Sequence, residues 1–169
     1  MMVALGVVFM VLGAVFEVFD LTAVALASLL MVFVYIELGS PYTFLVWLAT
    51  SLLTFIFYPG HFLWLEYLLV FGIYPVVKGY IERTNRALWL PLKLVYANLT
   101  FFLLAILSDL IIGVSIFADM SFFGLPATAV YIIAAILLNV AFVAYDIFIK
   151  VMVRFYYDKL QRRFSKFLK

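Results

Sequence analysis

The chain has no cysteine and a single histidine, His61, among its 169 residues. Without cysteine there are no disulfides, no thiol catalysis and no cysteine-based metal site, and one histidine is too few for bis-histidine haem ligation. Charged residues are also scarce, at 12% of the chain against about 25% in a typical soluble domain. Hydrophobic residues make up 69%. This composition predicts an integral membrane protein built as one domain.

The short motifs of common enzyme classes are absent too. The sequence contains no G-x-S-x-G, H-E-x-x-H, G-x-x-x-x-G-K-[ST] or G-x-G-x-x-G pattern. The middles of its apolar runs carry no charge, which argues against a carboxylate proton relay and against a voltage sensor. We therefore expect no enzymatic activity, no cofactor, no metal ion and no nucleic-acid partner. Because the chain has no ATP-binding motif, active transport would require partner subunits.

Six apolar runs are present, each bounded by turn residues or charges. A helix needs about 20 such residues to cross a bilayer core of about 30 Å. Inside lipid every backbone N–H and C=O must be satisfied within the segment, and these runs are too long for barrel strands, so the predicted fold is all-α. Gly39 and Pro41 predict a compact turn between the second and third runs. Residues 1–152 are predicted to form one bundle of six transmembrane helices, with spans at about 1–19, 22–38, 41–57, 61–81, 91–113 and 126–152.

Lysine and arginine residues gather in only two places along the chain. Four of the eleven flank the connection between the fourth and fifth runs, and seven follow the sixth run. The positive-inside rule places both regions in the cytoplasm, and counting spans backward places the N-terminus there as well. We therefore predict a multi-pass protein of the cell (plasma) membrane with both termini cytoplasmic. The two groups are Lys78, Arg83, Arg86 and Lys93, and Lys150, Arg154, Lys159, Arg162, Arg163, Lys166 and Lys169.

Residues 153–169 have the pattern of a basic amphipathic helix. Apolar side chains fall in one sector of the helical wheel and basic side chains fill the opposite one. Such a tail can anchor the protein at the anionic inner face of the lipid bilayer. Docking to a cytoplasmic partner is the alternative interpretation.

A polar stripe runs along the sixth apolar run. At 100° per residue, Thr128, Asn139, Asp146 and Lys150 lie within about 40° of one another, so this stripe is expected to face protein rather than lipid. Asp146 and Lys150 also form an i,i+4 pair in the favourable order. The stripe therefore predicts an internal ion pair and interhelical hydrogen bonds from Asn139, whose amide is also a candidate ligand contact.

A second polar cluster is expected at the cytoplasmic ends of three spans. Glu37 ends the second run, Lys78 lies near the end of the fourth, and Lys93 begins the fifth. All three should lie at a similar depth, so we predict that Glu37 pairs with Lys78 or Lys93. The role is expected to be structural, because lysines at the ends of spans commonly extend to the interface.

The side expected to face outward carries carboxylates but no lysine or arginine. Glu66 is about one turn inside the outer end of the fourth run, and Asp109 is about 24 Å above Lys93 at 1.5 Å per residue. Together with Trp64 and Tyr67, these carboxylates predict an outward-facing pocket for a cationic or hydroxyl-rich ligand. The alternative is that both carboxylates reach water and that the aromatic residues belong to the interfacial belt.

The chain resembles a family of small bacterial six-span membrane proteins. The resemblance covers about residues 30–160 and is carried by residues 37–86, Asn98 and residues 137–148; its most specific part is YP-x-x-K-x-x-IE, from Tyr74 to Glu82. That family is in turn similar in size and span number to the substrate-binding S-components of energy-coupling factor (ECF) vitamin transporters. The resemblance implies a six-helix bundle that captures a vitamin-like small molecule from its outer half. It also implies a transmembrane coupling subunit and ATPase subunits as partners.

Two functions are therefore compatible with the sequence. The first is a substrate-capturing subunit of an ECF-like transporter, favoured by six spans, the lack of an internal motor and an acidic, aromatic outer side. The alternative is a structural or scaffold subunit of a membrane complex that does not transport, in which the basic tail is the docking element.

Overall fold

The computed structural model describes residues 1–16, 19–113 and 127–160. Over these residues the chain is helical and contains no β-strand, which confirms the predicted all-α class for this part. Among these residues, four helices are long and apolar enough to cross a membrane, compared with the six predicted spans. Their bounds by this criterion are Asp20–Leu38, Ser40–Phe57, Arg86–Ile112 and Ala129–Asp158.

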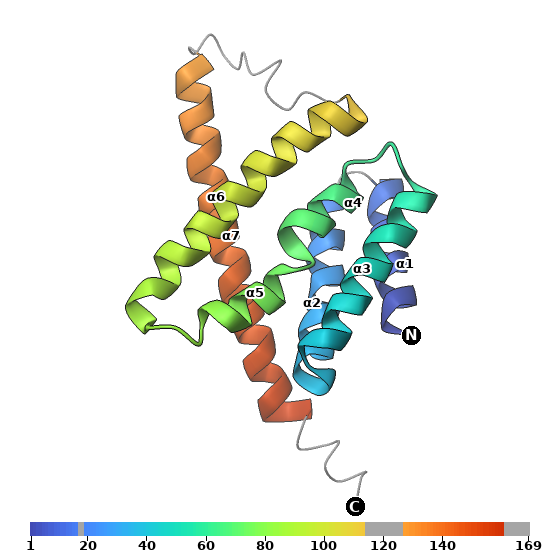
Figure 1. Ribbon diagram of the computed structural model, residues 1–169, viewed down its shortest axis with the longest axis vertical. Coiled ribbons are helices and arrows are strands. Elements are labelled where there is room, and N and C mark those ends of the chain that lie inside the picture. The colour runs from blue at the N-terminus through green and yellow to red at the C-terminus, as the bar shows by residue number, and fades with distance from the viewer. Residues whose placement is uncertain (17–18, 114–126, 161–169) are drawn as a thin grey trace, which may run out of the picture.

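The first three helices pack side by side (Figure 1). They are α1 (Met2–Phe16), α2 (Asp20–Leu38) and α3 (Ser40–Phe57). Helix α1 is shorter than the predicted first run, and residues 17 and 18 of that run lie outside the described residues. Between α2 and α3, Gly39 has a φ of 85° and a ψ of 178°, backbone that only glycine adopts readily. This single residue makes the compact turn that the sequence predicts.

The fourth predicted span is not one continuous helix. It consists of α4 (Leu63–Glu66), the π-helix η1 (Tyr67–Phe71) and α5 (Tyr74–Ile81), together called the broken segment below. The predicted span over 61–81 is thus divided into three helical pieces. The interruption falls at residues 72 and 73, just before Pro75, which has no N–H to donate to a helical carbonyl. The broken segment lies in the centre of the hydrophobic core.

The last two long helices cross each other beside the broken segment (Figure 1). A short 3₁₀ turn, η2 (Arg86–Leu88), leads into α6 (Trp89–Leu107), which ends in the π-helix η3 (Ser108–Ile112). Helix α7 (Ala127–Phe155) continues into η4 (Tyr156–Leu160), so it extends past the predicted end at 152. Pro126 and residues 161–169, which include Arg162, Arg163, Lys166 and Lys169 of the predicted tail, lie outside the described residues.

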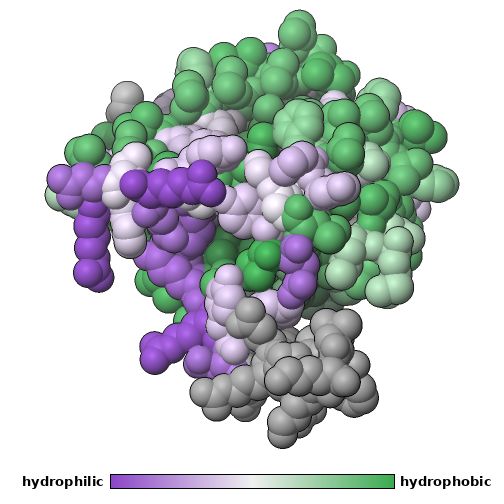
Figure 2. All heavy atoms as spheres, turned by 60° about the horizontal axis from the view of Figure 1, so that its bottom comes forward, coloured by the Kyte–Doolittle hydropathy of each residue, from purple (hydrophilic) through white to green (hydrophobic). Residues whose placement is uncertain are grey.

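Polar and apolar side chains are unevenly distributed over the surface. Hydrophilic side chains gather at the end of the molecule that is at the bottom of Figure 1, and hydrophobic side chains lie above and to the right of them in Figure 2. Large apolar side chains are exposed along the long helices, such as Ile56 on α3, Val95 on α6 and Leu137 on α7. A surface of this kind suits lipid contact rather than water. We call the hydrophilic end the charged end.

Candidate functional site

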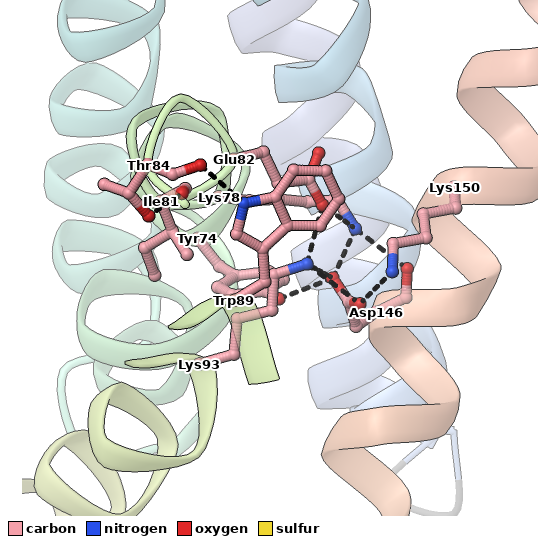
Figure 3. A network of polar contacts seen from close by, with 9 residues as sticks. All are labelled: Tyr74, Lys78, Ile81, Glu82, Thr84, Trp89, Lys93, Asp146 and Lys150. Atoms are coloured by element: carbon pink, nitrogen blue, oxygen red, sulfur yellow. Dashed lines mark hydrogen bonds and ion pairs between the residues drawn. The ribbon is translucent and has the colours of Figure 1, made fainter. Parts of the chain in front are cut away.

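At the charged end, one carboxylate of α7 joins three helices (Figure 3). Asp146 accepts a hydrogen bond of 2.6 Å from the Tyr74 hydroxyl and a bond from the Lys78 ammonium, both on α5. The Lys93 ammonium of α6 lies 3.0 and 3.1 Å from its two oxygens, and the Lys150 ammonium lies 3.1 Å from Oδ2. Asp146 is thereby the common acceptor of α5, α6 and α7.

Glu82 is the second carboxylate of this group. Its Oε1 lies 2.6 Å from the Lys93 ammonium and 3.6 Å from that of Lys78. Lys78 and Lys93 are only 5% and 3% exposed, so the two carboxylates compensate two buried positive charges. We call Lys78, Glu82, Lys93, Asp146 and Lys150 the charge network. Both oxygens of Asp146 and Oε1 of Glu82 contact ammonium groups, so the network holds α5, α6 and α7 together.

The network confirms the predicted i,i+4 pair of Asp146 and Lys150 but differs from the predicted cluster of Glu37 with two lysines. Lys78 and Lys93 do lie together, but their partners are Asp146 and Glu82. Glu37 instead accepts a hydrogen bond from the Tyr156 hydroxyl of η4, so the predicted pairing of Glu37 with a lysine is wrong. Lys150 pairs with Asp146 as an i,i+4 neighbour and remains 48% exposed at its side chain. The side chain of Thr128, the first residue of the predicted stripe, lies outside the described residues.

Asn139 joins α7 to α6 at their crossing. Its Nδ2 donates to Asn98 Oδ1 at 3.1 Å, and Asn98 Nδ2 donates back to Asn139 Oδ1 at 3.0 Å. Each amide nitrogen also donates to a backbone carbonyl of its own helix at 2.8 Å. The amide that was expected to contact a ligand is therefore engaged in an interhelical pair.

Side chains from neighbouring helices satisfy the carbonyls that the broken segment frees. The Trp47 indole donates to the Leu68 carbonyl at 3.1 Å. The Tyr96 hydroxyl lies 3.0 and 2.9 Å from the carbonyl oxygens of Leu69 and Val70. Backbone that leaves a regular helix at membrane depth is tolerated only with such partners. No role is predicted from sequence for Tyr96 and Trp47, because nothing local to either residue indicates the broken segment that they contact.

A cavity of about 360 Å³ lies between α4, α6 and α7. Glu66 is the only charged residue among the described residues that line it, and Asn98 and Tyr131 are the other polar ones. The rest of the wall is apolar and includes Phe101 and Leu104 of α6. Apolar walls with a few polar groups are typical of sites for small organic molecules.

The other residues of the predicted outer pocket lie elsewhere. The Trp64 indole donates to the Pro59 carbonyl at 3.2 Å and packs on Phe55. Tyr67 is fully buried in the core, and its hydroxyl has no hydrogen-bond partner among the described residues. Asp109 is exposed on η3 and does not line the cavity. Of the five predicted ligand contacts, the structure brings only Glu66 to the cavity wall.

The cavity and the charge network offer different chemistry. The network is filled with its own ion pairs, whereas the cavity has the volume for a small molecule and one carboxylate to orient it. Among the described residues, no group of three histidine, aspartate or glutamate side chains could hold a metal ion. No family model, curated protein or solved structure matches the chain. The cavity is therefore the best candidate for a functional site.

Proposed function

We propose that the chain is a membrane subunit that captures a small molecule for a transporter, as the S-components of ECF transporters do. The observation that carries the proposal is the cavity of about 360 Å³ between α4, α6 and α7, with Glu66 as its only charged side chain among the described residues. Pockets of about 300–1,000 Å³ with apolar walls and a few polar groups suit organic ligands of this size. The capture of such a ligand requires no catalytic group.

The proposal includes a six-pass topology in the plasma membrane. The four long apolar helices supply four passes, and α1 and the broken segment supply the other two. Both termini and the charge network belong to the cytoplasmic side in this topology, because the lysines and arginines of the α5–α6 connection lie there. Glu66 then belongs to the outer half of the membrane, and the ligand is bound on that side.

The broken segment supports a role in transport. Interrupted helices whose carbonyls are satisfied by neighbouring side chains are a recurrent feature of transporter binding sites. Here Glu66 belongs to the piece before the interruption and Lys78 to the piece after it. The charge network fixes the second piece to α6 and α7, whereas the first piece meets the cavity. Because the chain has no ATP-binding motif, energy comes from a coupling subunit and ATPase subunits.

The proposal is tested by purifying the tagged protein from its own membranes in lipid nanodiscs. Mass spectrometry then identifies the proteins recovered with it and the small molecules released on denaturation. Ala134 lines the cavity, so the larger side chain of Ala134→Trp should occupy the cavity volume and abolish retention of the small molecule. Ala144→Trp, at an exposed position of the same helix outside the cavity, is the matched control and should retain it.

The expected result is a retained small molecule together with ATPase and coupling subunits. Recovery with structural envelope proteins, and no retained molecule in the wild-type protein, would contradict the proposal. That outcome would support the alternative role of a scaffold subunit that does not transport.

A further inference from the structure

We propose that the ligand of the cavity is an amphipathic organic cation, with an apolar body and one protonated amine that pairs with Glu66. The inference rests on the proposed function, because it assumes that a small molecule occupies this cavity. It adds the chemical class of that molecule. Three features of the described residues carry it: the charge of the cavity wall, its apolar surface and its apolar rim.

The charge of the wall is the first feature. Glu66 forms no ion pair with a lysine, arginine or histidine among the described residues. The three lysines of α5, α6 and α7 are engaged in the charge network at the other end of the molecule.

A carboxylate in apolar surroundings is costly without a partner of opposite charge, and without one the group takes up a proton instead. A ligand amine supplies that partner and forms a charge-assisted hydrogen bond. An anionic ligand would meet no lysine or arginine among the described lining residues, and a neutral ligand would gain only a neutral hydrogen bond from Glu66. The negative charge of Glu66 in the cavity wall therefore favours a cationic ligand.

The rest of the wall limits the ligand to one charged group. Phe62, Phe101 and Leu104 line the cavity with apolar surface, and the Phe rings add faces that attract a cation. The remaining polar residues, Asn98 and Tyr131, carry no formal charge. Asn98 donates its amide hydrogens to Leu94 and Asn139, so it is already engaged. Most of the ligand surface must therefore be apolar.

The rim of the cavity is apolar as well. Phe102 of α6 and Leu138 of α7 line it and are 60% and 42% exposed. Above their crossing, α6 and α7 diverge (Figure 1). In the topology proposed above, this rim lies at the depth of lipid chains, so a ligand that partitions into the bilayer can reach Glu66 from there. An amphipathic amine has this property, whereas a strongly hydrated polyvalent ion does not.

The test uses three probes that share a naphthyl body and differ in charge. They are the cation 2-(1-naphthyl)ethylammonium, the neutral 1-naphthaleneethanol and the anion 1-naphthaleneacetate. Saturable binding to the full chain in lipid nanodiscs is followed by naphthyl fluorescence, with empty nanodiscs to subtract partition into lipid. The amine should bind about tenfold or more tightly than the alcohol, because a charge-assisted bond replaces a neutral one. The acetate should show no saturable binding.

Glu66→Gln keeps the shape of the side chain and removes its charge. In this variant the amine and the alcohol should bind with equal affinity, whereas Asp109→Asn, outside the cavity, should keep the wild-type preference. Equal binding of amine and alcohol to the wild-type protein would overturn the inference, even if Glu66→Gln fails to fold. A retained natural molecule that is neutral or anionic would overturn the ligand class while leaving the capture function standing. The absence of both a retained molecule and any saturable probe would overturn both.

Discussion

Asp146→Asn tests whether the charge network holds α5, α6 and α7 together. The substitution keeps an oxygen for the Tyr74 hydroxyl but removes the negative charge that Lys78 and Lys93 share. In the variant the Lys93 ammonium still has Glu82 Oε1 at 2.6 Å, whereas the Lys78 ammonium has the same oxygen only at 3.6 Å. The main effect is therefore one buried ammonium, that of Lys78, without a close carboxylate.

Breaking a buried ion pair on one side costs about 3–5 kcal/mol, and the remaining contact with Glu82 favours the lower end. We expect Asp146→Asn to lower the free energy of unfolding by about 3 kcal/mol. The assay is reversible unfolding by SDS titration in mixed micelles, followed by tryptophan fluorescence. Asp158→Asn is the matched control: its side chain is 71% exposed and 3.9 Å from Arg154, so its loss should be within about 0.5 kcal/mol.

Adding Lys78→Met to Asp146→Asn removes the charge that was left without a partner, and it should recover part of the loss. A loss below about 1 kcal/mol for Asp146→Asn would refute the reasoning about burial. So would a double variant that is no more stable than Asp146→Asn alone.

Tyr96→Phe removes the hydroxyl that serves two carbonyls of η1, so the same titration should show a loss of about 1–3 kcal/mol; an unchanged midpoint would contradict this role. Gly72→Ala would place a Cβ 2.6 Å from a backbone oxygen of η1 and should destabilise by about 1–3 kcal/mol. At Gly60 an added Cβ would meet no neighbouring atom within 4 Å, so Gly60→Ala should leave stability unchanged. Equal losses of stability in Gly72→Ala and Gly60→Ala would count against close packing at residue 72. Asn98→Ala and Asn139→Ala should show a coupling of about 0.5–2 kcal/mol, whereas strict additivity would mean that the amide pair contributes nothing.

The long helices could be predicted from sequence because their limits are set locally. The bounds of α3 differ by one residue from the predicted run, since Gly39 and Pro41 mark its start. The broken segment could not be found in this way. Pro75 alone indicates a kink, but a full interruption needs donors for the freed carbonyls, and these come from Tyr96 and Trp47 on other helices.

Only part of the candidate site could be predicted, again because contacts between different helices determine it. Depth along the spans correctly predicts that Lys78 and Lys93 lie together, and the predicted i,i+4 pair of Asp146 with Lys150 is confirmed, but the ion pairs of Asp146 with Lys78 and Lys93 are not predicted. A carboxylate has about four acceptor positions, so one pairing did not exhaust it. For the cavity, the π-helices η1 and η3 change the angular spacing of side chains. A period of 3.6 residues therefore could not orient Tyr67 or Asp109.

The central claim is that a small molecule occupies the cavity between α4, α6 and α7. Because the chain has no cysteine, Ala134→Cys places a single thiol in the cavity wall and Ala144→Cys places one outside it. The measurement is the rate of labelling by N-ethylmaleimide in solubilised protein, with and without the small-molecule fraction released by heat from the wild-type protein. If the cavity holds the molecule, this fraction slows labelling at position 134 and leaves the rate at position 144 unchanged. Equal rates at position 134 with and without the fraction would contradict the claim.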